Sequence, residues 1–126
     1  MEELVKTAIK MRALAHAPYS DYSVGAAVIT EDGSIFGGCN VESSSYSLTC
    51  CAERVAIFNA ITSGYKNFEG LAVATENGSP PCGACRQVIW DLCSDIPIFI
   101  CDSHGAVSET TSKILLPDAF GAEHLS

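Results

Sequence analysis

Basic residues are scarce in this chain. Its 126 residues include 7 Lys and Arg against 15 Asp and Glu, which gives a formal net charge of −8. Proteins that bind nucleic-acid polymers usually carry a basic surface that neutralises phosphates. The one basic cluster, Lys6, Lys10 and Arg12, has the spacing of a solvated helix face. We therefore expect no nucleic-acid polymer as partner, and any substrate related to nucleic acids should be a free base or nucleoside.

Long hydrophobic runs are missing as well. No segment approaches the ~18 apolar residues of a membrane-spanning helix, and the acidic start, Met1–Leu4, has no apolar core of a signal peptide. We therefore expect a cytoplasmic protein without a membrane partner, in a compartment where cysteines stay reduced. Repeats, low-complexity tracts and linkers are also absent, and residues 1–126 suit a single catalytic domain.

Helical and strand-like patterns alternate along the chain, which is typical of the α/β class. The expected helices cover about 2–15, 49–64 and 82–96, and the expected strands cover 22–29, 35–39, 68–75 and 98–101, with a weaker strand after Gly105 and a helical turn over 112–116. The buried positions should be Val55, Phe58 and Ile61 in the second helix, and Cys85, Ile89 and Leu92 in the third. The turn signal at 31–34 predicts a hairpin, so the sheet should not be purely parallel. The expected architecture is a three-layer α/β/α sandwich with a mixed, roughly five-stranded sheet.

Cysteine is the residue that the sequence uses in a patterned way. An odd count of seven without a secretion signal argues against a disulfide framework. Four of the seven lack ligand spacing and are expected to be small packing residues: Cys39, Cys50, Cys93 and Cys101. The three histidines, His16, His104 and His124, also lack ligand spacing. The candidate metal ligands are therefore Cys51, Cys82 and Cys85.

Two short motifs contain these three cysteines, and each motif falls at a predicted helix start. Cys51–Arg54 has the pattern C-x-E-R, and Cys82–Cys85 is a C-x-x-C pair. Unpaired N–H groups and the helix dipole at an N-terminus favour thiolates, which are what zinc requires. Three protein ligands with one open position are typical of catalytic zinc, whereas structural sites close with four. Glu53 stands two residues after a ligand, where its carboxylate could carry protons beside the open position.

Three other interpretations remain open at this point. The C-x-x-C pair could be a redox motif, but that leaves Cys51 without a role. Cys50 could be a fourth ligand, although adjacent residues point in different directions on a helix. A non-catalytic protein could also use zinc as a structural staple, and such a protein would have no need of Glu53.

The two motifs together match the signature of zinc deaminases. Nearly the whole chain resembles the small cytidine deaminases, the class with three cysteine zinc ligands. The resemblance rests on the motifs Ala17–Ser20, Val24–Ala27, Gly38–Glu42, Ser45–Tyr46, Cys51–Arg54, Cys82–Gln87 and Leu115–Pro117, and on Phe120. Two positions depart from the usual family pattern: Ser43 replaces an asparagine, and Pro80 replaces the serine that usually precedes the proline of the C-x-x-C motif.

The resemblance implies a role for each matching position. One Zn²⁺ per chain would be held by Cys51, Cys82 and Cys85, with Glu53 as the proton shuttle. The substrate would be contacted by Asn40 and Glu42 at the ribose hydroxyls, by Tyr22 and the backbone of Ala52 at the base, and by Phe120 of a neighbouring subunit. The class forms homotetramers, so the sites would lie near subunit interfaces.

The implied reaction is hydrolytic deamination of cytidine and deoxycytidine to uridine and deoxyuridine with release of ammonia, a step of pyrimidine salvage. Three thiolates leave a zinc site with excess negative charge, which weakens the metal as a Lewis acid. We expect the two helix N-termini and Arg54 to offset that charge, with Gln87 assisting by fixing Arg54. The alternatives are a deaminase of another amino-heterocycle on the same fold, and the non-catalytic structural-zinc protein described above.

Overall fold

A mixed sheet of five strands forms the centre of the computed structural model, which describes residues 1–125. The strands are β1 (Gly25–Thr30), β2 (Ile35–Cys39), β3 (Phe68–Ala74), β4 (Pro97–Cys101) and β5 (Val107–Thr111). Their spatial order is β2-β1-β3-β4-β5. Only the β3–β4 pair is parallel, and the other three pairs are antiparallel. The predicted hairpin is confirmed, with Gly33 at a positive φ of 89° in its turn.

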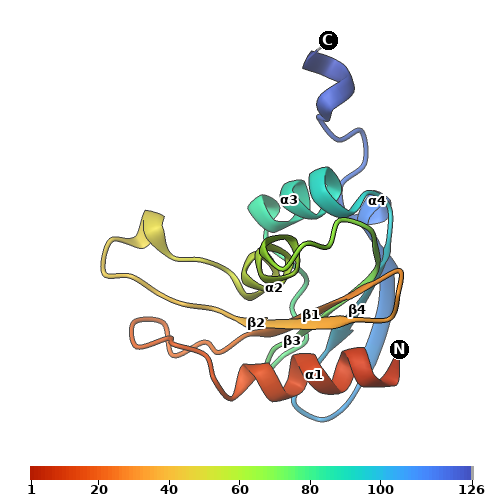
Figure 1. The fold of residues 1–126 in the computed structure, drawn as a ribbon. Coiled ribbons are helices and arrows are strands. Elements are labelled where there is room, and N and C mark those ends of the chain that lie inside the picture. Colours follow the sequence, from red (N-terminus) through yellow and green to blue (C-terminus); the bar gives the residue numbers. More distant parts are fainter. Residues whose placement is uncertain (126) are drawn as a thin grey trace.

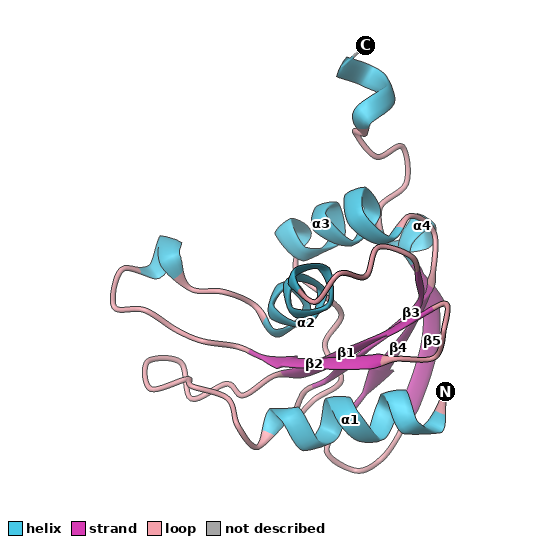
Figure 2. Ribbon diagram, viewed as in Figure 1, coloured by secondary structure: helices cyan, strands magenta, loops and turns pink. Residues whose placement is uncertain are grey.

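Helices cover both faces of this sheet, as Figures 1 and 2 show. The helix α1 (Glu2–Arg12) covers one face, and α2 (Ala52–Thr62) and α3 (Gly83–Cys93) cover the other. The shorter elements are α4 (Ser112–Leu115) and two 3₁₀ helices, η1 (Tyr46–Leu48) and η2 (Ala122–Leu125). The predicted three-layer α/β/α sandwich is therefore confirmed. Among residues 1–125, no helix has the length and apolar character needed to cross a bilayer.

The alternation of small and branched residues along the strands divides the core into two halves. Ala26 and Val28 of β1 pack toward α2 and α3, with Ile57 and Ile89 fully buried in that half. Ala27 faces the opposite way and packs on α1, where the i, i+4 pair of Leu4 and Ala8 is fully buried. Because successive side chains of a strand point to opposite faces, one strand serves both halves of the core.

Two glycines let helices lie unusually close to the sheet. A Cβ on Gly38 of β2 would lie 2.4 Å from the backbone nitrogen of Ala56 in α2. A Cβ on Gly25 of β1 would lie 2.1 Å from the carbonyl oxygen of Ala8 in α1. Neither distance leaves room for a side chain, since the van der Waals contacts of non-bonded carbon atoms begin at about 3.5 Å. The missing side chains therefore set the depth at which α1 and α2 pack.

The predicted buried faces of two helices are partly wrong. In α2 the buried residues are Ala52, Glu53, Ala56, Ile57 and Ala60, whereas the predicted Phe58 and Ile61 are exposed. The close approach at Gly38 explains this, because only small side chains fit between a helix and a strand at that distance. In α3 the predicted Cys85 and Ile89 are buried, but Cys93 replaces Leu92 as the third buried position.

The start of α2 also differs from the prediction. The helix begins at Ala52, with Cys51 rather than Thr49 as its N-cap. Residues before it are held in an extended conformation by paired backbone bonds between Val41 and Cys50. The consequence for the site is that a candidate metal ligand itself occupies the helix terminus.

Candidate active site at the start of two helices

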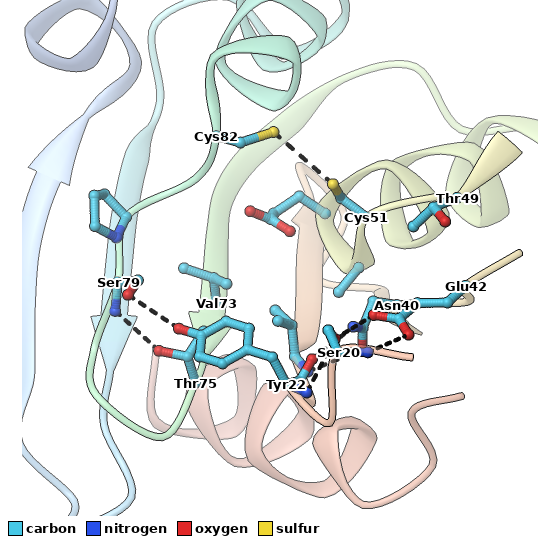
Figure 3. Close-up of a pocket in the computed structure, with 14 residues that line it drawn as sticks. Ser20, Tyr22, Asn40, Glu42, Thr49, Cys51, Val73, Thr75, Ser79 and Cys82 are labelled. Carbon is cyan, nitrogen blue, oxygen red and sulfur yellow. Dashed lines mark hydrogen bonds between the residues drawn. The ribbon is translucent and has the colours of Figure 1, made fainter. Parts of the chain in front are cut away.

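Three cysteine sulfurs meet where α2 and α3 begin. Cys51 is the N-cap of α2, Cys82 is the N-cap of α3, and Cys85 lies in the first turn of α3. The sulfur atoms of all three lie within 4.8 Å of one another. The Cys51 and Cys82 sulfurs are 3.8 Å apart, as drawn in Figure 3. Segments 31 residues apart in the chain thus place their thiols in one cluster.

This cluster has the dimensions of a zinc site. Zn–S bonds of about 2.3 Å in tetrahedral geometry place two sulfurs roughly 3.8 Å apart, which is the separation of the Cys51 and Cys82 sulfurs. Cys85 is buried, Cys51 is half-buried and Cys82 is exposed, so the cluster is closed on one side and open on the other. Cys50 is outside the group of potential ligands formed by residues 1–125. The residues present therefore fit a zinc ion with three protein ligands and an open fourth position.

Positive charge is concentrated at the sulfurs. The guanidinium of Arg54 donates to the Cys51 sulfur at 3.2 Å, and the cluster lies at the N-termini of two helices, where the helix dipole is positive. A hydrogen bond with Cys85, followed by the contact with Arg54, lowers the pKa of Cys51 to about 5. The same hydrogen bond between the Cys51 and Cys85 thiols, together with burial, raises the pKa of Cys85. Cys51 is therefore the sulfur that carries the negative charge when the thiols share protons.

Glu53 is a buried carboxyl beside this cluster. Its side chain is only 4% exposed, because the first turn of α2 packs against the sheet. Burial raises the pKa of Glu53 to about 7, the negative charge of Cys51 adds to the shift, and Arg54 opposes it. A carboxyl group that titrates near neutrality can accept a proton and later return it, as a general base and acid must.

A cavity of about 280 Å³ opens in front of Glu53 and two of the sulfurs. Its lining comes from five segments of the chain and consists of Ser20, Tyr22, Val24, Asn40, Glu42, Thr49, Cys51, Ala52, Glu53, Val73, Thr75, Ser79, Pro80 and Cys82. Figure 3 shows the labelled side chains around this space. Among the residues predicted from the sequence to contact substrate, Tyr22, Asn40, Glu42 and Ala52 are all in this lining.

The carboxylate of Glu42 is held in place at one side of the cavity. Its Oε1 accepts hydrogen bonds from the backbone nitrogens of Tyr19 and Ser20, at 3.0 and 3.1 Å. Its Oε2 accepts a hydrogen bond from the Ser20 hydroxyl. That hydroxyl is the main cause that lowers the pKa of Glu42, so the group is a fixed anion at neutral pH.

Asn40 connects the cavity to the segment before β1. It is 7% exposed, and its amide oxygen accepts from the backbone nitrogen of Val24 at 2.9 Å. Its amide nitrogen donates to the carbonyl of Tyr22 at 2.8 Å. The side chain of Asn40 therefore fixes the path of the chain that carries Tyr22.

Two predicted residues lie elsewhere. The amide of Gln87 donates to the Asp91 carboxylate at 3.2 Å and to the carbonyl of Phe120 at 2.8 Å. These partners differ from the predicted one, Arg54, because the side chain of Gln87 points toward the C-terminal segment. Phe120 lies on that segment, which projects from the body in Figure 1; its ring is 56% exposed and stacks on His124.

Several residues of the cavity were not predicted as site residues from the sequence. They are Ser20, Val24, Thr49, Val73, Thr75, Ser79 and Pro80. Ser20 and Val24 belong to motifs that support the family resemblance, and Pro80 was noted as a departure, but no spacing rule connects any of them to the cysteines. Their common feature is a position in a loop, or at a strand end, that only the folded chain brings to the helix termini.

Comparisons with known proteins agree with this geometry. The family model described as "Cytidine and deoxycytidylate deaminase zinc-binding region" matches residues 1–100. A cytidine deaminase of Sporosarcina psychrophila is 46% identical over 129 residues, which cover 100% of this chain and 95% of that protein. A more distant relative, blasticidin-S deaminase of Bacillus cereus, is 30% identical over 125 residues, with 91% of this chain and 88% of that protein covered.

A solved structure gives the same result. The crystal structure of cytidine deaminase from Burkholderia pseudomallei superposes with a TM-score of 0.91 at 44% sequence identity. The match covers 94% of this chain and 98% of that one. The fold of the chain is thus that of this relative.

Proposed function

Because this chain belongs to the cytidine and deoxycytidylate deaminase zinc-binding family, we propose that it is a zinc-dependent cytidine deaminase in which Glu53 carries the protons. The reaction converts cytidine and water to uridine and ammonia. The observation that supports this proposal most strongly is the burial of the Glu53 carboxyl at an open three-sulfur cluster. A structural zinc site would have no use for a carboxyl group in that place.

Cys51, Cys82 and Cys85 hold the metal in this proposal. When bound, zinc supplies a Lewis acid that lowers the pKa of a water molecule at its open position. Arg54 offsets the negative charge of the ligand set through its hydrogen bond to the Cys51 sulfur. Removing that guanidinium by Arg54→Ala should leave the fold intact and lower turnover. Wild-type turnover in a zinc-loaded Arg54→Ala protein would contradict this role.

Glu53 performs the proton transfers. It takes a proton from the water that attacks C4 and delivers it to N3 of the cytosine ring. It then takes the remaining proton of the new C4 hydroxyl and passes it to the amino group, which leaves as ammonia when the C4–N bond breaks and the C4 carbonyl forms. A pKa raised by burial to about 7 suits a group that alternates between base and acid near neutral pH. The dry position of Glu53 also strengthens its interactions with the developing charges.

Asn40, Glu42, Tyr22 and the backbone of Ala52 bind the substrate. Glu42 is an anion fixed at the cavity wall, so it can accept hydrogen bonds from ribose hydroxyls but repels a phosphate. The formal charge of −8 acts in the same direction. These charges favour free nucleosides, cytidine and deoxycytidine, over nucleotides or polynucleotides.

The proposal is tested by the loss of the cytidine ultraviolet band, with ammonia measured in parallel, for zinc-loaded wild type and Glu53→Gln. We expect turnover in the wild type and a loss of at least about 10²-fold in the variant, since positioned proton transfer contributes this much or more. Equal zinc content in both proteins shows that the variant has lost the shuttle and not the metal. Turnover by Glu53→Gln at the wild-type rate would refute the assignment of Glu53.

The same assay distinguishes a second candidate function. The relation to blasticidin-S deaminase favours another amino-heterocycle as the alternative substrate. A wild-type protein that converts blasticidin S but neither cytidine nor deoxycytidine would overturn the nucleoside assignment. A protein that carries one zinc per chain and converts none of the three would favour the structural-zinc alternative.

A homotetramer is the assembly that we propose, with Phe120 entering the site of a neighbouring subunit. This is supported by the projecting C-terminal segment and by large apolar side chains that are exposed in the single chain, among them Tyr46 at 75% and Leu48 at 73%. Light scattering coupled to gel filtration should give four times the chain mass of 13.3 kDa. A monomer that is fully active would contradict this arrangement.

Residues 1–126 act as one catalytic domain in this proposal. The cytoplasm is the compartment that we propose, because all seven cysteines are unpaired and three of them are needed as thiolates. Fractionation of cells that produce the protein should recover the activity with the cytoplasmic fraction.

A further inference from the structure

Three polar side chains, two of which line the cavity, meet on the side of the cavity away from Asn40 and Glu42. The hydroxyl of Tyr22 lies 2.6 Å from the amide oxygen of Asn77 and 3.0 Å from the hydroxyl of Ser79. The Ser79 hydroxyl lies 2.8 Å from the same amide oxygen. The contacts link residues 55 and 57 positions apart in the chain, so they join two loops that meet only in the folded protein.

The chemistry of the groups determines the direction of these bonds. A hydroxyl has one proton, so the Tyr22 hydroxyl donates to its nearer partner, the Asn77 oxygen, and is left with acceptor capacity toward Ser79. The three contacts share two hydroxyl protons, so the single proton of Ser79 goes either to the Tyr22 oxygen or to the second lone pair of the Asn77 oxygen. The hydroxyl of Thr75, 3.4 Å away, is a weaker partner of Asn77. Thr75 instead accepts from the backbone nitrogen of Ser79 at 2.9 Å.

The ring of Tyr22 is consequently held at both ends. At its backbone, the nitrogen donates to the Ser20 hydroxyl at 3.0 Å and the carbonyl accepts from Asn40 at 2.8 Å. At its tip, Asn77 and Ser79 hold the hydroxyl. Figure 3 shows the side chain reaching across the cavity from the side of Asn40 to the side of Ser79 and Thr75.

The loop that contributes Asn77 and Ser79 is built to place them together. Gly78 between them has a φ of +71°, a conformation that residues with a side chain rarely adopt. This turn brings the side chains on either side of Gly78 to the same hydroxyl. The end of this loop has an anchor of its own, because Arg86 donates to the carbonyl of Pro81 at 2.8 Å just before Cys82.

We propose that Asn77 and Ser79 are positioning residues of this site, which hold the Tyr22 hydroxyl and so keep its ring in place as a preformed wall of the base pocket. This proposal rests on the function proposed above, since it assumes that a pyrimidine nucleoside lies against Tyr22. Because the ring is already in place, substrate binding does not have to order a mobile side chain, and the entropy cost of binding is lower. The effect is therefore on KM, whereas turnover depends on Glu53 and the sulfurs, which other segments position.

The test compares KM and kcat for cytidine in Tyr22→Phe, Asn77→Ala and Ser79→Ala. Tyr22→Phe keeps the ring and removes only the hydroxyl. Each single variant should raise KM about 3- to 10-fold, the effect of one lost hydrogen bond, and change kcat less than about twofold. Asn77→Asp, which keeps the accepting oxygen, should restore KM to near the wild-type value. The matched control is Tyr65→Phe, the same chemical change at a ring that packs on Phe36 outside the cavity.

A double variant separates a shared role from independent effects. Since Asn77 acts through Tyr22, the pair Tyr22→Phe and Asn77→Ala should have the KM of Tyr22→Phe alone, a non-additive result. Independent effects that multiply would overturn the proposal, as would single variants with unchanged KM. A loss of zinc or of kcat without a change in KM would also overturn it, because that result indicates only structural support of Cys82. The wild type, measured alongside, tests the proposed function separately: no turnover of cytidine by the wild type would overturn both.

Discussion

The close approach of Gly38 to α2 leads to a prediction about the metal centre. In Gly38→Ala the new Cβ would lie 2.4 Å from the backbone nitrogen of Ala56, 2.8 Å from the carbonyl oxygen of Ala52 and 2.9 Å from the Cα of Ala56. All three are backbone atoms of one helix, so no side-chain rotation can relieve the clash. Contact distances begin near about 3.5 Å, so α2 must withdraw from the sheet by about 1 Å.

That movement would be felt at the active site. Cys51 and Glu53 move with α2, whereas Cys82 and Cys85 belong to α3. Zinc–ligand distances tolerate about 0.2 Å, and a displacement of about 1 Å at a reacting centre costs on the order of 10²-fold in rate. We expect Gly38→Ala to lower the free energy of unfolding by about 1–3 kcal/mol, as overpacking does, and to lower both zinc affinity and kcat/KM for cytidine.

The measurement is a chelator competition for zinc, together with cytidine turnover and urea denaturation of the same samples. Gly37→Ala is the matched control, since the three atoms nearest to its Cβ would all belong to the flexible side chain of Met11, which can move aside. We expect the control to stay within about 0.5 kcal/mol of wild type with normal zinc affinity, as replacements without a fixed clash do. Wild-type zinc affinity and turnover in Gly38→Ala would refute the reasoning that this glycine sets the position of Cys51 and Glu53.

Three further predictions concern the core, the buried carboxyl and the metal. Gly25→Ala, whose Cβ would lie 2.1 Å from the Ala8 carbonyl, should destabilise the fold by a similar ~1–3 kcal/mol but leave zinc affinity unchanged, because α1 lies on the other face of the sheet; weaker zinc binding in a chelator titration would contradict this. In chelator-treated protein, burial raises the pKa of Glu53 from 4.5 to about 7. The free energy of unfolding is therefore highest below pH 4.5, where Glu53 is protonated in both states, and it falls as the pH rises through about 7, because the buried carboxyl must then ionise. Glu53→Gln should therefore gain about 3 kcal/mol relative to wild type between pH 4 and pH 8, and urea unfolding that shows the same difference at both pH values would argue against it. Removal of zinc should lower the melting temperature, and restoring zinc should raise it with concentration, because the ion binds the folded state; a melting temperature independent of zinc would count against the three-cysteine site.

The helix pattern shows how far local sequence information reaches. The order and type of the helices and strands followed from periodicity and turn residues, because these reflect local backbone preferences and one-sided burial. The buried face of α2 could not be predicted from these local patterns. Phe58 and Ile61 are the larger apolar residues and were predicted to face the core, yet the alanine face is buried because Gly38 from another strand leaves no room for anything larger.

The site shows the same division. The motifs that contain Cys51, Glu53, Cys82 and Cys85 predicted a metal site and a proton carrier, because such chemistry requires particular residue types at short spacings, and the structure brings the three sulfurs together. Gln87 was predicted to support Arg54 but contacts Asp91 and the Phe120 carbonyl, since the neighbours of a side chain on a helix depend on what packs beside that helix.

The sequence by itself determined the class of fold, the likeness to zinc deaminases and the residues able to bind metal and carry protons. Only the tertiary structure decided that Cys51 caps α2, that Gly38 sets the depth of this helix, and that Tyr22 is held between Asn40 at one end and Asn77 and Ser79 at the other. The physical reason is that ligand type and backbone preference are properties of short segments. The distances between groups on different segments are set by the packing of the whole chain.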